Sequence, residues 1–510
     1  MKILFVSANL FYTEPLGLMM LSSIAKRQGH TTALLVLQSD NIIKKLSSFK
    51  PDLIAYSTMS ADLNSFLHAD LIISQWATKN NQKLIRIMGG PHATFFPEIK
   101  NELMLDAICI GEGDLVFQRI LTKASEQKTI QSIPNVIGYN ENINQIQKEL
   151  ISDLDQFPYA DRNIYYNARP IYRHFRLRSF LTARGRPFHC TYCHNATYNK
   201  MFAECGAIIR KHSVDYMIEE IKHTIKKHPP VRMVRFADDT FAYKIDNWLI
   251  QFLEKYKKEI NLPFYCLMRS NTLTEEMAKL LSKAGCCSIG MSLESGVESV
   301  RNNVLKRNLP DPVVIKSFEY AQKYGISAHG NAMSALPAGT LMHDLTTYTF
   351  SRNLKMGLSS FGIFMPYPKT ELTDYAIKLG QLDPQKIANR SFTRDKSPLN
   401  SYTEKEKNVQ LNIMYLGSIF ANLPDLFQPL FFRLIKLPPN LFYKIIGRSY
   451  VLYKFYRNIF PGVIPKNPLL LIPFYLKAMK YLLYQKNKKI QVGHAKNSNP
   501  IENQKIVYEN

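Results

Sequence analysis

The feature that most constrains the fold of this chain is a regular alternation of short apolar runs with amphipathic stretches through its first 140 residues. Short runs without a polar face are typical of strands buried on both sides of a parallel sheet, and the amphipathic stretches are typical of the helices that cover it. The predicted strands are residues 3–6, 32–37, 53–57, 84–88 and 107–110. The N-terminal part of the chain is therefore predicted to be an α/β domain.

Two turns that contain glycine follow predicted strands of this first region. Gly89, Gly90 and Pro91 come after strand 84–88, and Gly111 and Glu112 come after strand 107–110. Ligands of parallel α/β sheets bind beyond the carboxyl ends of the strands, and glycine lets the backbone approach a ligand closely. The two turns therefore predict a ligand-binding face at this edge of the sheet.

The strand and helix alternation resumes after a polar connector, residues 141–178. Six further strands are predicted within residues 179–385, at 180–182, 233–236, 264–268, 288–291, 327–332 and 361–364. Successive strand–helix units of this kind predict a partial or full parallel (β/α) barrel, whose functional residues lie at the C-terminal ends of the strands.

A loop after the first strand of the second region carries the most specific chemical pattern, RPFHCTYC over residues 186–193. An isolated Cys-x2-Cys pair is more often structural, or half of a zinc site, than a pair of iron–sulfur ligands. A cysteine in place of Arg186 would complete Cys-x3-Cys-x2-Cys, in which three thiolates hold a cubane cluster. A guanidinium is always protonated and has no free lone pair, so Arg186 cannot ligate iron. Cys190 and Cys193 are the predicted metal ligands, and the third ligand is left open.

Several motifs in one order extend this pattern along the chain. They are GGPHA at 89–93 with PE at 97–98, IGEGD at 110–114, the cysteine loop, FADDTF at 236–241, LESG at 293–296 with LKR at 305–307, and PYPKTEL at 366–372. Over residues 1 to about 380 the chain resembles the cobalamin-binding-domain radical S-adenosylmethionine (SAM) enzymes. The resemblance implies a Rossmann-like, doubly wound cobalamin-binding domain over 1–140 and a radical SAM barrel over 179–385. It also implies three cofactors: a [4Fe–4S] cluster, SAM and cobalamin.

The resemblance also implies which residues bind the cofactors. For SAM they are Tyr192 beside the adenine, Asp238 and Asp239 beside the methionine ammonium group, Glu294 at the ribose and Arg301 at the carboxylate; for cobalamin they are Gly89, Gly90, Pro91, Gly111 and Glu112. Taken without the resemblance, the two aspartates would be turn or helix-cap residues, Glu294 a solvated carboxylate and Tyr192 a core contact.

The chain departs from the family pattern at further strand ends besides Arg186. Ala335 and Ala338 stand where the family usually has glycine, Gly339 where it has glutamate, and Lys369 where it has glycine. These changes predict an altered SAM-binding face. Cys205, His189 and His194 are the remaining candidates for a third cluster ligand, although none fits the family spacing.

Composition limits the class of protein. At 510 residues the chain is too long for one core, and its 65 Lys plus Arg against 41 Asp plus Glu give a net charge of +24, which suits nucleic acid, an anionic membrane surface or an anionic substrate. The seven cysteines do not form a secreted disulfide pattern. Neither a signal peptide nor an uninterrupted apolar run long enough to span a bilayer is found. A cytoplasmic protein is expected, with possible peripheral contact to a membrane.

The C-terminal region changes character. Residues 401–510 contain 16 Lys plus Arg against 5 Asp plus Glu, beside many Phe, Tyr and Leu residues. Helices are predicted at 431–446, broken by the proline pair 438–439, and at 469–484. We interpret 386–490 as a basic aromatic helical extension that either contacts an anionic membrane or caps the barrel, and 491–510 as a disordered tail.

Three functions remain at this stage. The first is radical-based methyl transfer, or modification of a carbon skeleton, on a small hydrophobic substrate, which requires an electron donor. The second is a degenerate, non-catalytic homologue that binds SAM, a corrinoid or a partner without a full cluster. RNA binding ranks last, because no RNA-binding module follows the barrel. The missing cysteine leaves open whether the chain is an enzyme.

Overall fold

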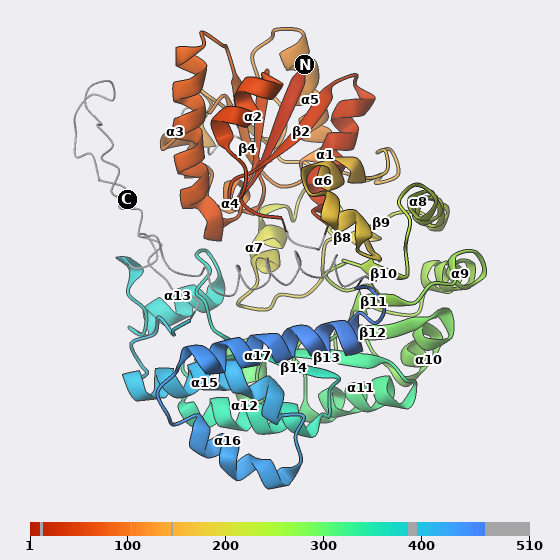
Figure 1. Cartoon of the computed structure of the whole chain (residues 1–510), viewed down its shortest axis with the longest axis vertical. Coiled ribbons are helices and arrows are strands. Elements are labelled where there is room, and N and C mark those ends of the chain that lie inside the picture. The colour runs from red at the N-terminus through yellow and green to blue at the C-terminus, as the bar shows by residue number, and fades with distance from the viewer. Residues whose placement is uncertain (11–13, 104, 144–145, 386–394, 465–510) are drawn as a thin grey trace.

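The computed structural model describes residues 1–10, 14–103, 105–143, 146–385 and 395–464. Two sheets form two lobes, with the N-terminal α/β domain at one end and the second sheet with the C-terminal helices at the other (Figure 1). Helix α7 (His194–Met201), which follows the cysteine loop, lies between the two lobes. The fold class predicted from the sequence is confirmed.

The first sheet has six strands, of which the first five in spatial order are parallel. They are β2 (Thr31–Val36), β1 (Lys2–Ser7), β3 (Leu53–Ser57), β4 (Ile85–Gly89), β5 (Ala107–Cys109) and the antiparallel β6 (Val136–Gly138). The main covering helices are α1 (Leu16–Arg27), α2 (Ile42–Phe49), α3 (Leu63–Lys79) and α5 (Asp114–Ser125). In β1, Ile3 and Phe5 belong to one hydrophobic cluster whereas Leu4 and Val6 belong to another. The central strand is therefore buried on both faces, which explains its continuous apolar sequence.

The connector between the lobes is packed rather than extended. Its helix α6 (Arg162–Ala168) buries Tyr165 and Tyr166, and the guanidinium of Arg162 forms ion pairs with Glu14 of the first lobe, at 3.3 Å, and Glu220 of the second, at 3.8 Å. The sequence prediction of a polar linker missed these contacts, because the charge of Arg162 is neutralised by residues that are distant in sequence.

The second sheet has six parallel strands in the order β14-β13-β12-β11-β10-β7. Their bounds are β7 (Leu177–Phe180), β10 (Met233–Phe236), β11 (Phe264–Leu267), β12 (Cys286–Gly290), β13 (Ser327–Ser334) and β14 (Leu358–Ile363). Helices α8 (Val214–Lys227), α9 (Asn247–Lys255), α10 (Glu275–Ala284), α11 (Asp311–Lys323) and α12 (Leu341–Asn353) follow strands of this sheet in turn. Because β7 and β14 are its two edges, the sheet forms a partial rather than a full barrel.

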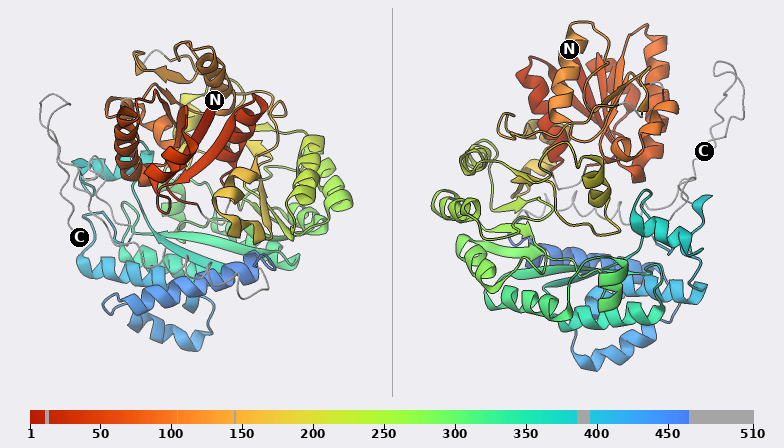
Figure 2. Two further views of the ribbon diagram at one scale, coloured as in Figure 1. Left: turned by 45° about the horizontal axis from the view of Figure 1, so that its top comes forward. Right: turned by 180° about the vertical axis from the view of Figure 1, so that it is seen from behind.

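The C-terminal extension packs against this partial barrel up to residue 464. Helix α15 (Glu404–Phe420) lies on β14, and α16 (Gln428–Leu434) and α17 (Leu441–Lys454) follow it (Figures 1 and 2). The next turn, η8 (Phe455–Ile459), enters the inner side of the sheet, where Ser288 Oγ donates to the Ile459 carbonyl at 2.5 Å. These contacts agree with the interpretation of a helical cap. The predicted helix 469–484 and tail 491–510 lie outside the described residues.

Within the part of the chain that the structure describes, no helix combines the length and apolarity that crossing a bilayer requires.

Candidate cofactor site

The cysteine loop connects the short strand β8 (Ala183–Arg184) to α7, with Cys193 at the helix N-cap. Cys190 is buried and Cys193 half-buried, and the Cys193 amide donates to the Cys190 carbonyl at 3.1 Å. The Arg186 guanidinium contacts Cys190 through Nη2, 3.6 Å from Sγ. The loop thus brings both predicted ligands together, with a cation at the position of the missing cysteine.

The donor set around the loop does not fit a cluster held by three protein thiolates. Nowhere in the described ranges do three His, Cys, Asp or Glu side chains gather as a metal ion requires, so Cys205 does not complete a site with the cysteine pair. His194 Nε2 donates to the Pro368 carbonyl at 3.0 Å, and the imidazole ring stacks on Phe95. Burial raises the pKa of the Cys193 thiol, a rise that Arg186 partly opposes.

The two predicted aspartates follow strand β10 and hold the loop. Asp238 Oδ1 accepts from the amides of Thr182, at 2.8 Å, and Ala183, at 2.6 Å, and from the Thr182 hydroxyl. Its buried Oδ2 has no hydrogen-bond partner among the residues that the structure describes. Burial raises the Asp238 pKa to about 7, although these hydrogen bonds oppose the rise. Asp239 accepts from Asn195 at 2.7 Å. Asp238 therefore orients the start of the cysteine loop and has one oxygen left for a ligand.

Tyr192 and Glu294, both implied to bind SAM, contact each other in the structure, and their role at SAM stays a prediction. The Tyr192 hydroxyl donates to Glu294 Oε1 at 3.0 Å, and Arg307 contacts both residues, with its Nη1 3.2 Å from the same Glu294 oxygen. Glu294 has a left-handed backbone, φ 65°, at the end of β12. Burial, followed by the charge of Glu294, raises the pKa of Tyr192. A neutral tyrosine, a carboxylate and a guanidinium thus form a polar cluster at the strand ends, which we call the Tyr192–Glu294–Arg307 cluster.

Arg301 does not take part in this cluster. It is fully buried, and its guanidinium donates to the Leu309 and Ser295 carbonyls, both at 2.8 Å, and pairs with Asp311. The guanidinium that reaches Glu294 is instead that of Arg307. From the sequence, Arg301 was predicted at the SAM carboxylate, whereas Arg307 was noted only within the LKR motif. No sequence signal distinguishes these two arginines.

Arg269 is a second site residue that sequence reasoning missed. Its guanidinium lies 4.1 Å from the centre of the Phe188 ring and donates to the Arg307 carbonyl. The same ring also contacts Arg186, at 5.6 Å, and Tyr243, at 5.8 Å between ring centres. Burial and the neighbouring Arg307 lower the pKa of Arg269 to about 10. Phe188 therefore lies between two cations beside the cysteine pair.

In the first lobe, the turn after β4 leaves no room for side chains. Gly90 has a φ of 94°, and a Cβ there would lie 2.9 Å from the Thr58 backbone at the end of β3. Gly89 ends β4 and Pro91 begins α4 (Pro91–Phe95). These three residues lie at the carboxyl edge of the sheet, where the sequence predicted a ligand, and their role in binding stays a prediction.

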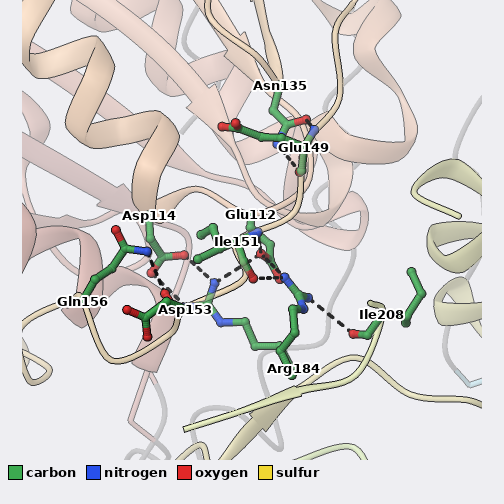
Figure 3. Close-up of polar contacts among 10 residues, drawn as sticks. Glu112, Asp114, Asn135, Glu149, Ile151, Asp153, Gln156, Arg184 and Ile208 are labelled. Carbon is green, nitrogen blue, oxygen red and sulfur yellow. Dashed lines mark hydrogen bonds and ion pairs between the residues drawn. The ribbon is translucent and has the colours of Figure 1, made fainter. Parts of the chain in front are cut away.

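Gly111 and Glu112 lie at the interface between the lobes. A Cβ on Gly111, φ 73°, would lie 2.5 Å from the Phe202 ring at the end of α7. Glu112 forms a bidentate ion pair with Arg210, with N–O distances of 2.7 and 2.8 Å. Asp114 forms a second bidentate pair with Arg184, at 2.6 and 3.0 Å (Figure 3). Glu112 was implied to bind cobalamin, but in the structure its carboxylate pairs with an arginine of the second lobe.

The departures from family glycines coincide with left-handed backbone. Ala335, Ala338 and Lys369 have φ values of 59°, 58° and 62°. Lys369 Nζ donates to the Phe95 carbonyl at 2.6 Å and pairs with Glu98 at 3.1 Å, so it connects the barrel to the first lobe. The backbone thus keeps a shape that favours glycine while the side chains have changed.

A cavity of about 140 Å³ lies on the inner side of the second sheet. Its walls include Arg235, Tyr265 and His329, and the aromatic rings of Phe455 and Phe460 from the C-terminal extension. Ser292 is another residue of the wall, and its backbone carbonyl accepts a hydrogen bond from Arg307 Nη2 at 2.7 Å. The cavity therefore adjoins the Tyr192–Glu294–Arg307 cluster.

Comparison with known proteins supports this architecture. The B12 binding domain model matches residues 3–121, and the Radical SAM superfamily model matches residues 182–341. An uncharacterized methyltransferase of Pyrococcus horikoshii is 26% identical over 376 residues, which cover 71% of this chain and 78% of that protein. Cytidylyl-2-hydroxyethylphosphonate methyltransferase of Streptomyces wedmorensis is 21% identical, covering 69% and 72%.

Two solved structures share the fold over most of the chain. The radical enzyme OxsB, with aqua-cobalamin and SAM bound, has a TM-score of 0.60 at 14% identity and covers 95% of this chain and 80% of its own. The methyltransferase TsrM of Kitasatospora setae, with cobalamin and a [4Fe–4S] cluster bound, also has a TM-score of 0.60, at 15% identity, covering 75% and 76%. Homologues therefore bind all three cofactors that the resemblance implied.

A B12 binding domain followed by a radical SAM partial barrel defines the class of cobalamin-dependent radical SAM proteins. The chain thus combines a region that matches the B12 binding domain model with a region that matches the Radical SAM superfamily model, and the two relatives described above are methyltransferases.

Proposed function

We propose that this chain binds SAM and a corrinoid and accepts a small, largely apolar molecule, without assembling the three-thiolate cluster of its family. The observation that carries the proposal is the Arg186 guanidinium, which lies against Cys190 Sγ at the position that the family spacing gives to a cysteine.

The chemistry of the donors supports the first part of this proposal. Cys190 and Cys193 supply two thiols, and the residue beside them is a permanent cation without a lone pair. Arg186 also stacks on Phe188, so the ring and the thiol together hold its side chain in the loop. Two thiolates leave a cubane with one protein ligand fewer than the family spacing provides, and such a cluster would be held weakly.

The binding of SAM is supported by groups that remain available. Asp238 Oδ2 is buried and has no partner within the described part of the chain, and a carboxylate oxygen suits the methionine ammonium group. The Tyr192–Glu294–Arg307 cluster offers hydroxyl, carboxylate and guanidinium groups at neighbouring strand ends. When bound, SAM and a corrinoid would supply methyl-group chemistry, and the residues named here would bind and orient them.

The cavity supports a small substrate. A cavity of about 150 Å³ is known to take a benzene-sized molecule, and this one has a similar volume of about 140 Å³. Burial lowers the pKa of His329 to about 4, so His329 is neutral near pH 7 and Arg235 is the charged group of the wall. A small apolar body with one anionic group fits this lining.

The proposal is tested by comparing the wild-type chain with Arg186→Cys after anaerobic purification and reconstitution. We expect the wild type to hold clearly fewer than four irons per chain, and Arg186→Cys to gain iron, sulfide and the absorbance of a cluster. Pro187→Cys is the matched control, because it adds a thiol one position away without restoring the spacing. SAM binding, measured by calorimetry, should persist in all three proteins. A full and stable cluster in the wild type would overturn the proposal.

The second candidate function is radical-based methyl transfer with a full cluster whose third ligand comes from elsewhere. It is supported by the similarity to methyltransferases and by the short distance between the two cysteines in the loop. It predicts that the reduced wild-type protein forms 5′-deoxyadenosine from SAM. Formation of this product only by Arg186→Cys would exclude the second candidate.

A further inference from the structure

The C-terminal helices expose an unusual concentration of large hydrophobic side chains. Eight of those that the described residues expose fall between positions 426 and 453. They include Leu426, which is 83% exposed, and Leu430, Leu437, Leu441, Phe442 and Ile446. Contiguous apolar surface of this kind on a folded protein marks an interaction site, whereas single exposed side chains do not.

Helix α17 is apolar on two sides. Its inner side packs on α15, with Tyr443 buried and Gly447 so close to Tyr415 that a Cβ would lie 1.9 Å from the Tyr415 carbonyl oxygen. Its outer side carries Phe442, Ile446 and Tyr453, which are spaced to lie along one helix face. The outer side of a surface helix is ordinarily polar, but the described residues leave this apolar stripe without a packing partner.

Basic residues accompany the exposed apolar side chains. Residues 421–464 contain six Lys plus Arg and a single acidic residue, Asp425, which pairs with Arg352 at 2.6 Å. Lys444 and Arg448 both pair with Asp395, whose single charge offsets one of the two cations. Arg433 and Lys436 are exposed and form no ion pair with any residue that the structure describes. The surface is thus apolar and cationic, which is the chemistry complementary to anionic lipid headgroups above an acyl layer.

We propose that α16, the turn at 435–440 and the outer stripe of α17 dock on the surface of an anionic lipid bilayer. Helix α16 lies at the end of the molecule opposite the N-terminal domain (Figures 1 and 2). The cysteine loop and α7 lie between the two lobes, so docking through α16 leaves the candidate cofactor site uncovered. The proposal is independent of the proposed function, because vesicle binding is measured without any cofactor.

The test is co-flotation of the full chain with vesicles. We expect binding to phosphatidylcholine vesicles that contain phosphatidylglycerol, weaker binding to phosphatidylcholine alone, and a loss of binding as salt rises. The double variant Phe442→Ser/Ile446→Ser should lower the affinity roughly tenfold or more, because it removes two apolar side chains from the contact. Arg433→Gln and Lys436→Gln should each weaken binding to the anionic vesicles about fivefold and leave binding to the neutral ones unchanged.

The matched control is Ile43→Ser/Ile250→Ser, which removes two exposed isoleucines outside the C-terminal helices. All substituted positions are exposed, so folding is expected to be unaffected, and thermal unfolding verifies this. The absence of flotation with anionic vesicles overturns the proposal, as does an equal loss of binding in the control. If the Phe442→Ser/Ile446→Ser variant instead turns a dimer into a monomer without changing flotation, the surface is an interface between copies of the chain and the proposal is wrong.

Discussion

At the scale of single residues, three residues of the second lobe that are not glycine hold a left-handed backbone, which favours glycine. Ala335, Ala338 and Lys369 all adopt positive φ, where a Cβ costs about 1–2 kcal/mol per residue. Lys369 gains contacts with the first lobe, whereas the two alanines gain no polar side-chain contact because they have no polar atoms. The backbone amides of Ala335 and Ala338 donate to Asp344 and Gln381, both at 3.0 Å, but glycine would make the same bonds without the strain of a Cβ at positive φ.

Ala338→Gly is expected to stabilise the protein by about 1 kcal/mol, because glycine adopts positive φ without strain, which outweighs the greater freedom of glycine in the unfolded chain. The midpoint of urea unfolding measures the change. Ala124→Gly, inside helix α5 and buried, is the control and should destabilise by about 1 kcal/mol. A destabilisation by Ala338→Gly as large as that of Ala124→Gly would contradict the strain at this position.

Asp238 should make stability depend on pH. Its pKa rises from the ordinary 3.8 to about 7, chiefly by burial, so between about pH 4 and pH 7 the folded protein holds a proton that the unfolded chain releases. Stability therefore falls as the pH rises through this window. In Asp238→Asn, urea midpoints measured from pH 4 to pH 7 should decline less steeply, because the amide does not titrate.

Asp344 offers an independent check of the same effect. Burial also raises its pKa to about 7, and it accepts from Gln410 at 2.8 Å and from the Ala335 amide at 3.0 Å. Asp238→Asn/Asp344→Asn should have the flattest stability profile between pH 4 and pH 7. An unchanged slope in the double variant would show that neither carboxyl group holds a proton in the folded protein at these pH values.

At the scale of elements, the fold depends on close contacts between helices of the C-terminal extension. Helix α15 begins with a capping box, in which Thr403 and Glu406 bond each other's backbone amides, and this start is readable in the sequence. The approach of α17 to α15 is not readable in the same way. It depends on Gly447, which no local motif distinguishes.

Gly447→Ala is expected to destabilise the protein by about 3 kcal/mol, since the added Cβ would lie 1.9 Å from the Tyr415 carbonyl oxygen and the backbone cannot yield cheaply. The change is measured by urea unfolding. Ser449→Ala, at an exposed position of the same helix, controls for helix propensity and should be neutral or slightly stabilising. Equal effects of the two substitutions would mean that α17 does not pack so closely on α15.

At the scale of the whole molecule, ion pairs hold the two lobes together. Arg184 and Arg210 of the second lobe pair with Asp114 and Glu112 of the first, and all four side chains are largely buried (Figure 3). A buried pair contributes little net stability, but the removal of one partner leaves an uncompensated charge. The interface is therefore sensitive to single substitutions.

Arg184→Met is expected to destabilise the protein by about 3 kcal/mol, because Asp114 then stays buried without its partner. Arg184→Met/Asp114→Leu should recover most of this loss, which a double-mutant cycle measures. Lys255→Met, which breaks the exposed pair with Asp215, is the control and should change stability by less than about 1 kcal/mol. Failure of the double variant to recover stability would contradict a role for the buried pair.

Much of this site could be predicted from the sequence, because the motifs place their residues directly after strands. Tyr192, Glu294 and Asp238 lie where strand ends meet, and parallel strands bring their carboxyl ends to one edge. Arg301 and Arg307 were not distinguishable, since both follow the same strand and only the packing of the loop decides which guanidinium turns inward. Arg269 was missed for the same reason.

The sequence by itself determined the two α/β lobes and the presence of an arginine at position 186. Local periodicity encodes strands and helices, and the identity of residue 186 cannot be altered by folding. Only the tertiary structure decided that Glu112 pairs across the lobes, that Phe455 and Phe460 line a cavity inside the barrel, and that the described residues leave the outer side of α17 exposed. These features depend on contacts between residues far apart in the chain, which no local pattern records.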